Sequence, residues 1–329
     1  MALVALLSNP RASGNQAMLP RVRRFCAAHK DVFHYEVEHA DQIGAALRSI
    51  ARVKPKVLVI NGGDGTVQAA LTELYHGGHF GAPGTPDGPP PVAVLPNGKT
   101  NLIAHDLGAS GDPIEALERV VELARADLAP HIVGRELIAL SDGDPAGRPV
   151  LGMFLGGAGL ADTMLYCRHK IYPLGLPNWL AHGLTFLLGL LGVLVGRNSL
   201  FVPTPPRSLT VSVTRSGVFQ GRFALLIVTT LQRLLLGNNM PGAGERGGAM
   251  QLLVIERSIP AIMRAFVAAL RGRLGRYRMT GVHLERGEEI RIEGESSSLL
   301  MDGELFEAGA GRPIVLRPTA PVPFLTLAA

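Results

Sequence analysis

The sequence predicts an α/β domain at the N-terminus and a mainly β, sandwich-like domain at the C-terminus. In the first third, short apolar runs alternate with segments of helical spacing, which is typical of a largely parallel sheet. From about Leu128 onward, short alternating segments follow one another between Gly, Pro and Asp residues, as in antiparallel sheets. We therefore predict domains over residues 1–127 and 128–329, with a C-terminal segment able to pack back on the first domain.

The first domain is expected to alternate strands and helices from its first residues. Its strands are expected at residues 4–8, 32–37, 57–60 and 92–95, and its helices at residues 16–28, 42–51, 67–74, 102–107 and 113–126. Loops rich in Gly, Pro and Asn follow three of the strands, at residues 9–14, 61–66 and 96–101. Ligands bind at the carboxyl ends of parallel strands, so these loops are the first place to look for a site.

The second domain is expected to consist mainly of strands. They are predicted at residues 132–140, 150–155, 209–214, 219–229, 251–255, 282–285 and 289–293. Helical insertions are expected near residues 161–195 and 260–274.

Composition limits the classes of molecule that this protein is expected to bind. The 329 residues carry a formal charge of +5, which suits a nucleotide, a nucleic acid or an anionic membrane surface. Aromatic residues make up only 5%, fewer than a base-stacking protein usually has, so we expect no nucleic acid. Two cysteines, Cys26 and Cys167, cannot form a disulfide framework or a zinc cage, which fits a reducing cytoplasm. The apolar residues 1–7 lack a basic lead and are typical of a first strand rather than a signal peptide.

One long apolar segment, residues 179–196, admits two interpretations. His182, Thr185 and four glycines interrupt it, so the uninterrupted part is shorter than the roughly 20 residues of a spanning helix. It is either a buried core helix or a helix that lies at a bilayer interface, with basic residues on both sides.

The sequence Asn61-Gly-Gly-Asp-Gly-Thr66 is the strongest local signal. It joins a buried strand to a helix, and its glycines would allow backbone conformations closed to other residues and a close approach of a ligand. Backbone amides at a helix N-terminus favour a phosphate. Asp64 would repel a phosphate, so we expect it to hold Mg²⁺, while Thr66 would add a hydroxyl and a helix cap. The alternative is a simple tight turn with an Asp cap.

Two further motifs follow, Leu95-Pro-Asn-Gly-Lys-Thr-Asn101 and Met301-Asp-Gly-Glu-Leu-Phe306. Together with the loop at residues 9–14, this order resembles the diacylglycerol kinase catalytic-domain family, which includes bacterial lipid kinases and the sphingosine and ceramide kinases. The resemblance extends over nearly the whole chain. It implies an ATP-binding N-terminal domain, a β-sandwich C-terminal domain and an active site in the cleft between them.

The resemblance also implies roles for individual residues. Asn9 and Ser13 would line the nucleotide pocket, and Gly98 and Asn101 would form its second wall. The phosphate loop would comprise Asn61, Gly62, Gly63, Asp64, Gly65 and Thr66. Asp302 would be the general base for the lipid hydroxyl, with Glu304 beside it. Asp64 is the rival candidate for the base, and Asp302 alone could also be an ordinary Asp-Gly turn between strands.

The chain departs from the family pattern at three places. Lys99 stands where Thr is usual, and Leu102 stands where Asp is usual. Lys99 still offers a point charge to a phosphate. Residues 248–252 contain no carboxylate, which argues against the structural magnesium site that some members have there.

These features predict an ATP- and Mg²⁺-dependent lipid kinase, cytoplasmic and peripherally bound to membranes. Its acceptor would be a hydroxyl of a diacylglycerol-like, sphingoid or ceramide lipid. Arg264, Arg271 and Arg278 recur every seven residues and would form either a solvated face or a patch for anionic lipid. Two alternatives remain: a soluble-metabolite kinase similar to NAD kinases, and a nucleotide-binding membrane sensor without catalysis.

Overall fold

The structure is a computed structural model that describes residues 3–82, 85, 87–98, 100–142, 147–159, 161, 208–214, 216–232, 249–275, 277–294, 297–308 and 312–328. The chain divides into two compact units. Unit 1 consists of Met1–Ala139, Arg148–Met153 and Thr319–Ala329, and unit 2 consists of Leu140–Gly147 and Phe154–Pro318. Unit 1 is α/β and unit 2 is mainly β, which confirms the predicted fold class.

Unit 1 is built on a six-stranded sheet of order β2-β1-β3-β4-β18-β5. The strands are β1 (Val4–Ser8), β2 (Val32–Glu36), β3 (Val57–Asn61), β4 (Val92–Val94), β5 (Ile132–Arg135) and β18 (Val322–Leu325). All neighbours are parallel except β18 and β5. The carboxyl ends of β1, β3 and β4 therefore meet at one edge of the sheet.

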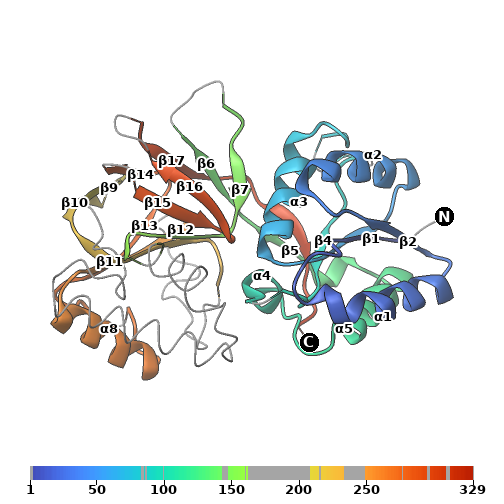
Figure 1. Ribbon diagram of the computed structural model, residues 1–329, viewed down its shortest axis with the longest axis horizontal. Helices are drawn as coiled ribbons and strands as arrows, with labels where there is room; N and C mark the ends of the chain where they lie inside the picture. Colours follow the sequence, from blue (N-terminus) through green and yellow to red (C-terminus); the bar gives the residue numbers. More distant parts are fainter. Residues whose placement is uncertain are drawn as a thin grey trace. The chain divides into compact units, whose positions relative to one another are not determined.

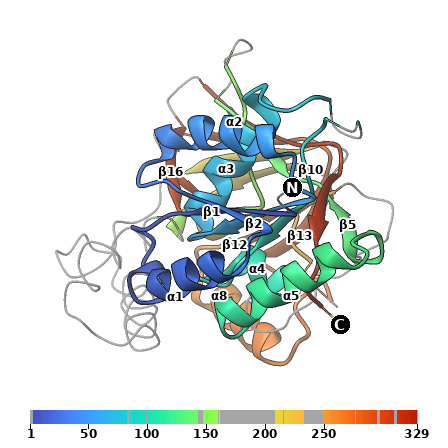
Figure 2. The same ribbon diagram turned by 90° about the vertical axis from the view of Figure 1, so that its right-hand side faces the viewer.

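Helices cover both faces of this sheet. They are α1 (Asn15–Ala28), α2 (Ile43–Val53), α3 (Asp64–His76), α4 (Leu102–Asp106) and α5 (Pro113–Arg125), with short 3₁₀ turns at Ala40–Gln42 and Ala129–His131. Figures 1 and 2 show α2 and α3 on one face and α1 and α5 on the other. The core under α1 and α5 joins Val4, Leu6 and Val59 of the sheet to Val22 and Leu117 of the helices, all fully buried. This packing holds the strand ends in fixed positions.

Unit 2 contains most of two further six-stranded sheets, whose orders are β10-β9-β14-β17-β6-β7 and β13-β12-β11-β8-β15-β16. β6 and β7 lie where the chain passes from one unit to the other. Among β8 to β17, the strands that are neighbours in these two sheets pair in antiparallel fashion. The strands are β6 (Ile138–Ser141), β7 (Val150–Gly152), β8 (Phe154–Gly157), β9 (Leu209–Val213), β10 (Gly217–Gly221), β11 (Phe223–Thr229), β12 (Met250–Glu256), β13 (Val282–Gly287), β14 (Ile290–Gly294), β15 (Ser297–Met301), β16 (Glu304–Ala308) and β17 (Ile314–Pro318).

Three long strands predicted for the second half are each two strands. The predicted strand at 132–140 is β5 plus β6, the one at 150–155 is β7 plus β8, and the one at 219–229 is β10 plus β11. In the first case the break is fixed by Leu137, whose N–H donates to Thr319 Oγ1 at 3.0 Å. β5 and β6 then belong to different sheets, which the alternation of residues along the chain does not reveal.

The helix predicted at 260–274 is α8 (Ile259–Leu270), and it ends earlier than expected. Gly272 and Gly275 follow it with positive φ angles of 61° and 83°, which take the chain out of helical geometry. Arg278 therefore lies outside the helix, and the predicted seven-residue arginine face is wrong.

None of the helices in the described part of the chain combines the length and the hydropathy that a membrane-spanning helix requires. The apolar segment 179–196, and the helical insertion predicted near 161–195 with the exception of Ala161, lie outside the described residues.

Candidate functional site

Three predicted loops meet at the carboxyl edge of the unit 1 sheet. β1 pairs in parallel with β3, and β3 with β4, so the loops that follow these strands are neighbours. The Asn9 N–H donates to the Asn61 carbonyl at 2.9 Å, which joins the first loop to the second. The structure thus brings together the candidate residues of unit 1: Asn9, Ser13, Asn61, Gly62, Gly63, Asp64, Gly65, Thr66, Gly98 and Asn101. Lys99 lies outside the described residues.

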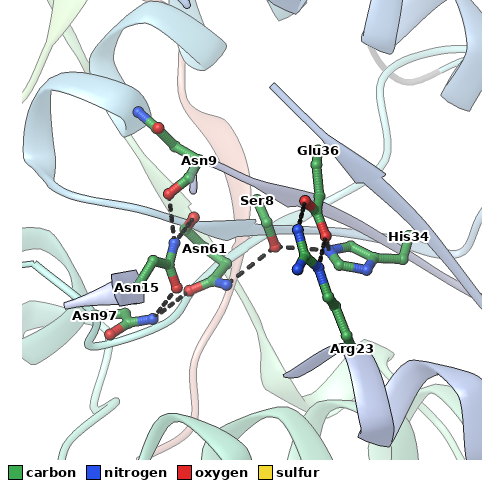
Figure 3. A network of polar contacts seen from close by, with 8 residues as sticks. All are labelled: Ser8, Asn9, Asn15, Arg23, His34, Glu36, Asn61 and Asn97. Carbon is green, nitrogen blue, oxygen red and sulfur yellow. Dashed lines mark hydrogen bonds and ion pairs between the residues drawn. The ribbon is translucent and has the colours of Figure 1, made fainter. Parts of the chain in front are cut away.

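A buried network of short polar side chains fixes these loops (Figure 3). Asn97 Nδ2 donates to Asn61 Oδ1 at 2.8 Å and also to Asn15 Oδ1. Asn61 Nδ2 donates to Ser8 Oγ at 3.0 Å, and Asn15 Nδ2 donates to the carbonyls of Asn61 and Asn9 at 3.0 and 2.7 Å. All but Asn9 are buried. Such buried groups are costly unless they are paired, and here they pair with one another, so the loops are held in one arrangement.

Ser8 and Asn15 were missed by sequence reasoning. Each is a single polar residue at the junction between an apolar strand or helix and a loop, and it resembles an ordinary loop residue. The available signal was the recurrence of a short polar side chain at or just after the end of three buried strands, at Ser8, Asn61 and Asn97. At Asn61 the side chain is fully buried, so it shapes the loop from beneath.

The glycines of the second loop are required for space rather than for unusual backbone angles. None of Gly62, Gly63 and Gly65 has a positive φ, so the expected left-handed conformations are absent from this loop. A Cβ on Gly98 would lie 2.9 Å from Gly63 Cα, which means that the second and third loops can touch only because position 98 is glycine. A Cβ on Gly63 would meet nothing within 4 Å. Gly63 therefore faces open space at the helix N-terminus.

Helix α3 begins earlier than predicted. Its N-cap is Gly63, and Asp64 and Thr66 lie in its first turn, so the expected capping role of Thr66 is wrong. Thr66 instead accepts a hydrogen bond from Asn9 Nδ2 at 2.9 Å, which adds a second link between the first two loops. Asn9 Oδ1 accepts from the Arg11 N–H at 2.9 Å, and the exposed Ser13 lies in the same loop.

Asp64 links the second loop to the third. Its carboxylate accepts hydrogen bonds from the backbone N–H groups of Leu102 and Ile103, at the start of α4. Burial raises the pKa of Asp64 to about 6, although these two N–H groups and the nearby His105 favour the ionised form. Within the third loop, Asn101 adopts a φ of 54°, and its Oδ1 accepts from the Gly98 N–H at 2.5 Å.

Asp302 lies in unit 2, in the two-residue turn between β15 and β16. Asp302 and Gly303 both have positive φ, at 47° and 95°, as in the mirror-image turns that suit tight hairpins. The side chain is buried, and its Oδ1 accepts from the Phe154 N–H at 3.0 Å, while the Asp302 N–H donates to the Phe154 carbonyl at 2.9 Å. The turn is thus anchored to β8. Glu304 begins β16, and its side chain is exposed.

The described residues contain no group of three or more His, Cys, Asp or Glu side chains that could by themselves hold a metal ion. A cation beside Asp64 would therefore take its other ligands from phosphate oxygens and water. Mg²⁺ commonly binds in this way, through one or two carboxylates and a nucleotide, so the residues present fit Mg²⁺.

Comparison with known proteins agrees with this geometry. Residues 3–130 match the diacylglycerol kinase catalytic domain. The matched residues contain all three loops and the buried network, and the match indicates a kinase. No curated protein sequence matches the chain significantly.

The similarity to solved structures covers both units, whereas the family match ends at residue 130. One protein from Bacillus anthracis strain Sterne, provisionally assigned as a diacylglycerol kinase, is 17% identical, with a TM-score of 0.62 over 96% of this chain and 94% of that one. A diacylglycerol kinase from the same strain is 14% identical, with a TM-score of 0.59 over 98% of this chain and 96% of that one. At such identities the likeness establishes the fold.

Proposed function

We propose that the chain is an ATP- and Mg²⁺-dependent lipid kinase of the cytoplasm that works at membrane surfaces. Its acceptor is a hydroxyl of a diacylglycerol-like, sphingoid or ceramide lipid. The match of residues 3–130 to the diacylglycerol kinase catalytic domain supports the reaction class. The positive formal charge of +5 suits anionic partners.

The observation that carries the proposal is the open space beside Gly63 at the N-terminus of α3. The N–H groups of a helix's first turn have no partner within the helix and carry partial positive charge, so they bind phosphate oxygens. Gly62, Gly65 and Thr66 continue this surface. We assign the γ-phosphate of ATP to this position. Asn9, Ser13, Gly98, Lys99 and Asn101 then line the rest of the nucleotide site, and Asn61 positions the loop from below.

Asp64 would hold Mg²⁺ at this site, directly or through water. When bound, the ion neutralises charge on the phosphate oxygens. Protonation of Asp64 opposes its binding. The two N–H groups from α4 orient the carboxylate, and they also keep the second and third loops together when the nucleotide arrives.

Asp302 is the proposed general base, with Glu304 beside it, and Asp64 is the rival for that role. The base accepts the proton of the lipid hydroxyl while that oxygen forms a bond to the γ-phosphorus. The bond from the γ-phosphorus to the bridging oxygen breaks, and ADP leaves. The role requires Asp302 and Asp64 to serve the same reaction.

The test is a transfer assay with purified protein, labelled ATP, Mg²⁺ and vesicles that present each lipid class in turn. We expect label in one lipid class, with the phosphorylated product identified by mass spectrometry. NAD serves as a soluble acceptor in a parallel reaction. The proposal fails if protein that binds ATP labels no lipid, and label in NAD alone would identify a soluble-metabolite kinase instead.

A further inference from the structure

Helix α8, orange in Figure 1, contains several large apolar residues that are exposed. Its inner side packs Ala261 and Ala265 against Leu253 and Ile255 of β12 and Val282 of β13. The opposite side consists of four residues with 3- and 4-residue spacing, which we call the α8 face: Met263, Phe266, Val267 and Leu270, 41%, 39%, 37% and 61% exposed. A helix on the surface of a protein in water normally places polar residues there.

This exposure is concentrated rather than scattered. Of the eight large hydrophobic residues that are exposed in the described part of the chain, four form the α8 face. A fifth, Tyr277, lies seven residues beyond Leu270 and is 71% exposed. Single exposed apolar side chains are ordinary, but a contiguous group of them marks a surface that contacts something other than water.

The charges around the α8 face have one sign. Residues 257–284 contain six arginines and no Asp or Glu. Arg264, Arg271, Arg273 and Arg278 are exposed, and no salt bridge among the described residues involves them. Arg264 Nη1 donates to the Thr280 carbonyl, which ties the segment after the helix to α8. The stretch of chain that carries the α8 face is therefore basic and contains no acidic residue.

We propose that the α8 face, with Arg264, Arg271 and Arg273, is the surface by which this protein docks on an anionic lipid bilayer. The apolar side chains enter the interface between headgroups and acyl chains, and the guanidinium groups contact lipid phosphates. The exposed Tyr277 side chain would lie in the same region of the bilayer, since tyrosine is enriched at membrane interfaces. The inference rests on the proposed function, because a kinase for a membrane lipid meets its substrate at a bilayer.

A bilayer fits these features better than a protein partner does. A folded partner would need an apolar groove with acidic residues on its rim. An anionic membrane has an apolar interior and negative charge over its whole surface. A single straight helix can therefore bind it without a partner surface of complementary shape.

The test is flotation of the full chain, without ATP, on vesicles of phosphatidylcholine alone or mixed with phosphatidylglycerol. Wild-type protein should float with the mixed vesicles and less with neutral ones, and added salt should weaken the difference. Met263→Gln/Leu270→Gln, which leaves the charge unchanged, should lower partition into mixed vesicles at least about tenfold. Val218→Gln is the matched control, because Val218 is 65% exposed on β10, away from α8.

A second pair of variants tests the charges. Arg271→Gln/Arg273→Gln should weaken partition into mixed vesicles about tenfold at low salt and leave binding to neutral vesicles unchanged. Arg48→Gln/Arg52→Gln on α2 removes the same charge from exposed positions elsewhere and should change partition less than about twofold.

Wild-type flotation by both α8 variants, or no flotation by the wild type, would overturn the inference. A second assay measures phosphoryl transfer to a water-soluble short-chain lipid, a reaction that needs no bilayer. It therefore distinguishes failure of the docking inference from failure of the proposed function. If the α8 variants float normally while the transfer assay succeeds, docking at α8 is wrong and the kinase stands. If flotation depends on α8 but no lipid is ever labelled, docking stands and the kinase proposal fails.

Discussion

At the scale of single residues, short polar side chains hold the candidate site in place. Four buried side chains at the strand ends, from Ser8, Asn15, Asn61 and Asn97, form hydrogen bonds mainly with one another and with loop carbonyls. An unpaired buried amide would cost roughly 1–3 kcal/mol, so a single loop arrangement that pairs all of them is strongly favoured. Gly98 then allows the second and third loops to touch.

Gly63 and Gly98 should respond differently to an added methyl group. Gly63→Ala places its Cβ in open space at a φ of −81°, so the free energy of unfolding should change by less than about 1 kcal/mol. ATP affinity should fall about tenfold or more, because the methyl group occupies the proposed phosphate position. Gly98→Ala should destabilise the fold by roughly 1–3 kcal/mol through its contact with Gly63.

Urea denaturation and calorimetric titration with ATP measure these two quantities. Unchanged ATP affinity in Gly63→Ala would show that the phosphate binds elsewhere.

His34 makes the stability of unit 1 depend on pH. Its Nε2 lies 2.9 Å from Ser8 Oγ, so it continues the buried network toward the surface pair Arg23 and Glu36 (Figure 3). Burial lowers the pKa of His34 below its usual 6.5, against the attraction of Glu36. The unfolded chain then binds the proton more readily, so His34 contributes stability that is full above pH 6.5 and is lost as pH falls toward the folded pKa.

Thermal unfolding between pH 7.5 and 5.5 tests this, with pH values chosen to span the ordinary histidine range of about 6.5. The wild type should lose more stability on acidification than His34→Gln, whose amide can still bond to Ser8. Parallel pH profiles for the two proteins would contradict the assignment.

At the scale of elements, the last strand completes the first sheet. β18 lies between β4 and β5, nearly 200 residues away from β5 along the chain, and Phe324 pairs with Val92 on one side and Val133 on the other. Phe324 is fully buried. Unit 1 is therefore complete only when the C-terminal segment has joined it.

Phe324→Ala should destabilise unit 1 by roughly 3–5 kcal/mol, because it leaves a cavity in the middle of the sheet. Ile132→Ala is the matched control, since Ile132 lies on neighbouring β5 and is 38% exposed; it should cost less than about 1 kcal/mol. Denaturant unfolding, monitored by the loss of ATP binding, measures the stability of unit 1 in both variants. Equal effects would mean that β18 contributes little to the sheet.

At the scale of the whole molecule, the sequence indicated local structure better than long-range structure. The strand, glycine loop and helix around Asp64 were predictable, because the continuous apolar run at residues 57–60 is followed by Asn61 and a glycine-rich turn. The bond between Asp64 and the start of α4 was not, since it joins residues that are close only after folding. The division of residues 132–140 into β5 and β6 escaped for the same reason: both strands have the same alternation, and only long-range pairing separates them.

The anchoring of Asp302 also required the structure. Its Asp-Gly turn is a common hairpin signal, but the bond to the Phe154 N–H links residues 148 positions apart. This anchoring makes Asn a conservative replacement, because Asn tolerates a positive φ and its Oδ1 can still accept from Phe154.

The most direct test of Asp302 as the general base of a lipid kinase is phosphoryl transfer by Asp302→Asn. ATP affinity and unfolding should stay close to wild type, while transfer of labelled phosphate to lipid should fall about 10²–10⁴-fold, as expected for loss of a general base. A variant that transfers phosphate to lipid at the wild-type rate would contradict the account.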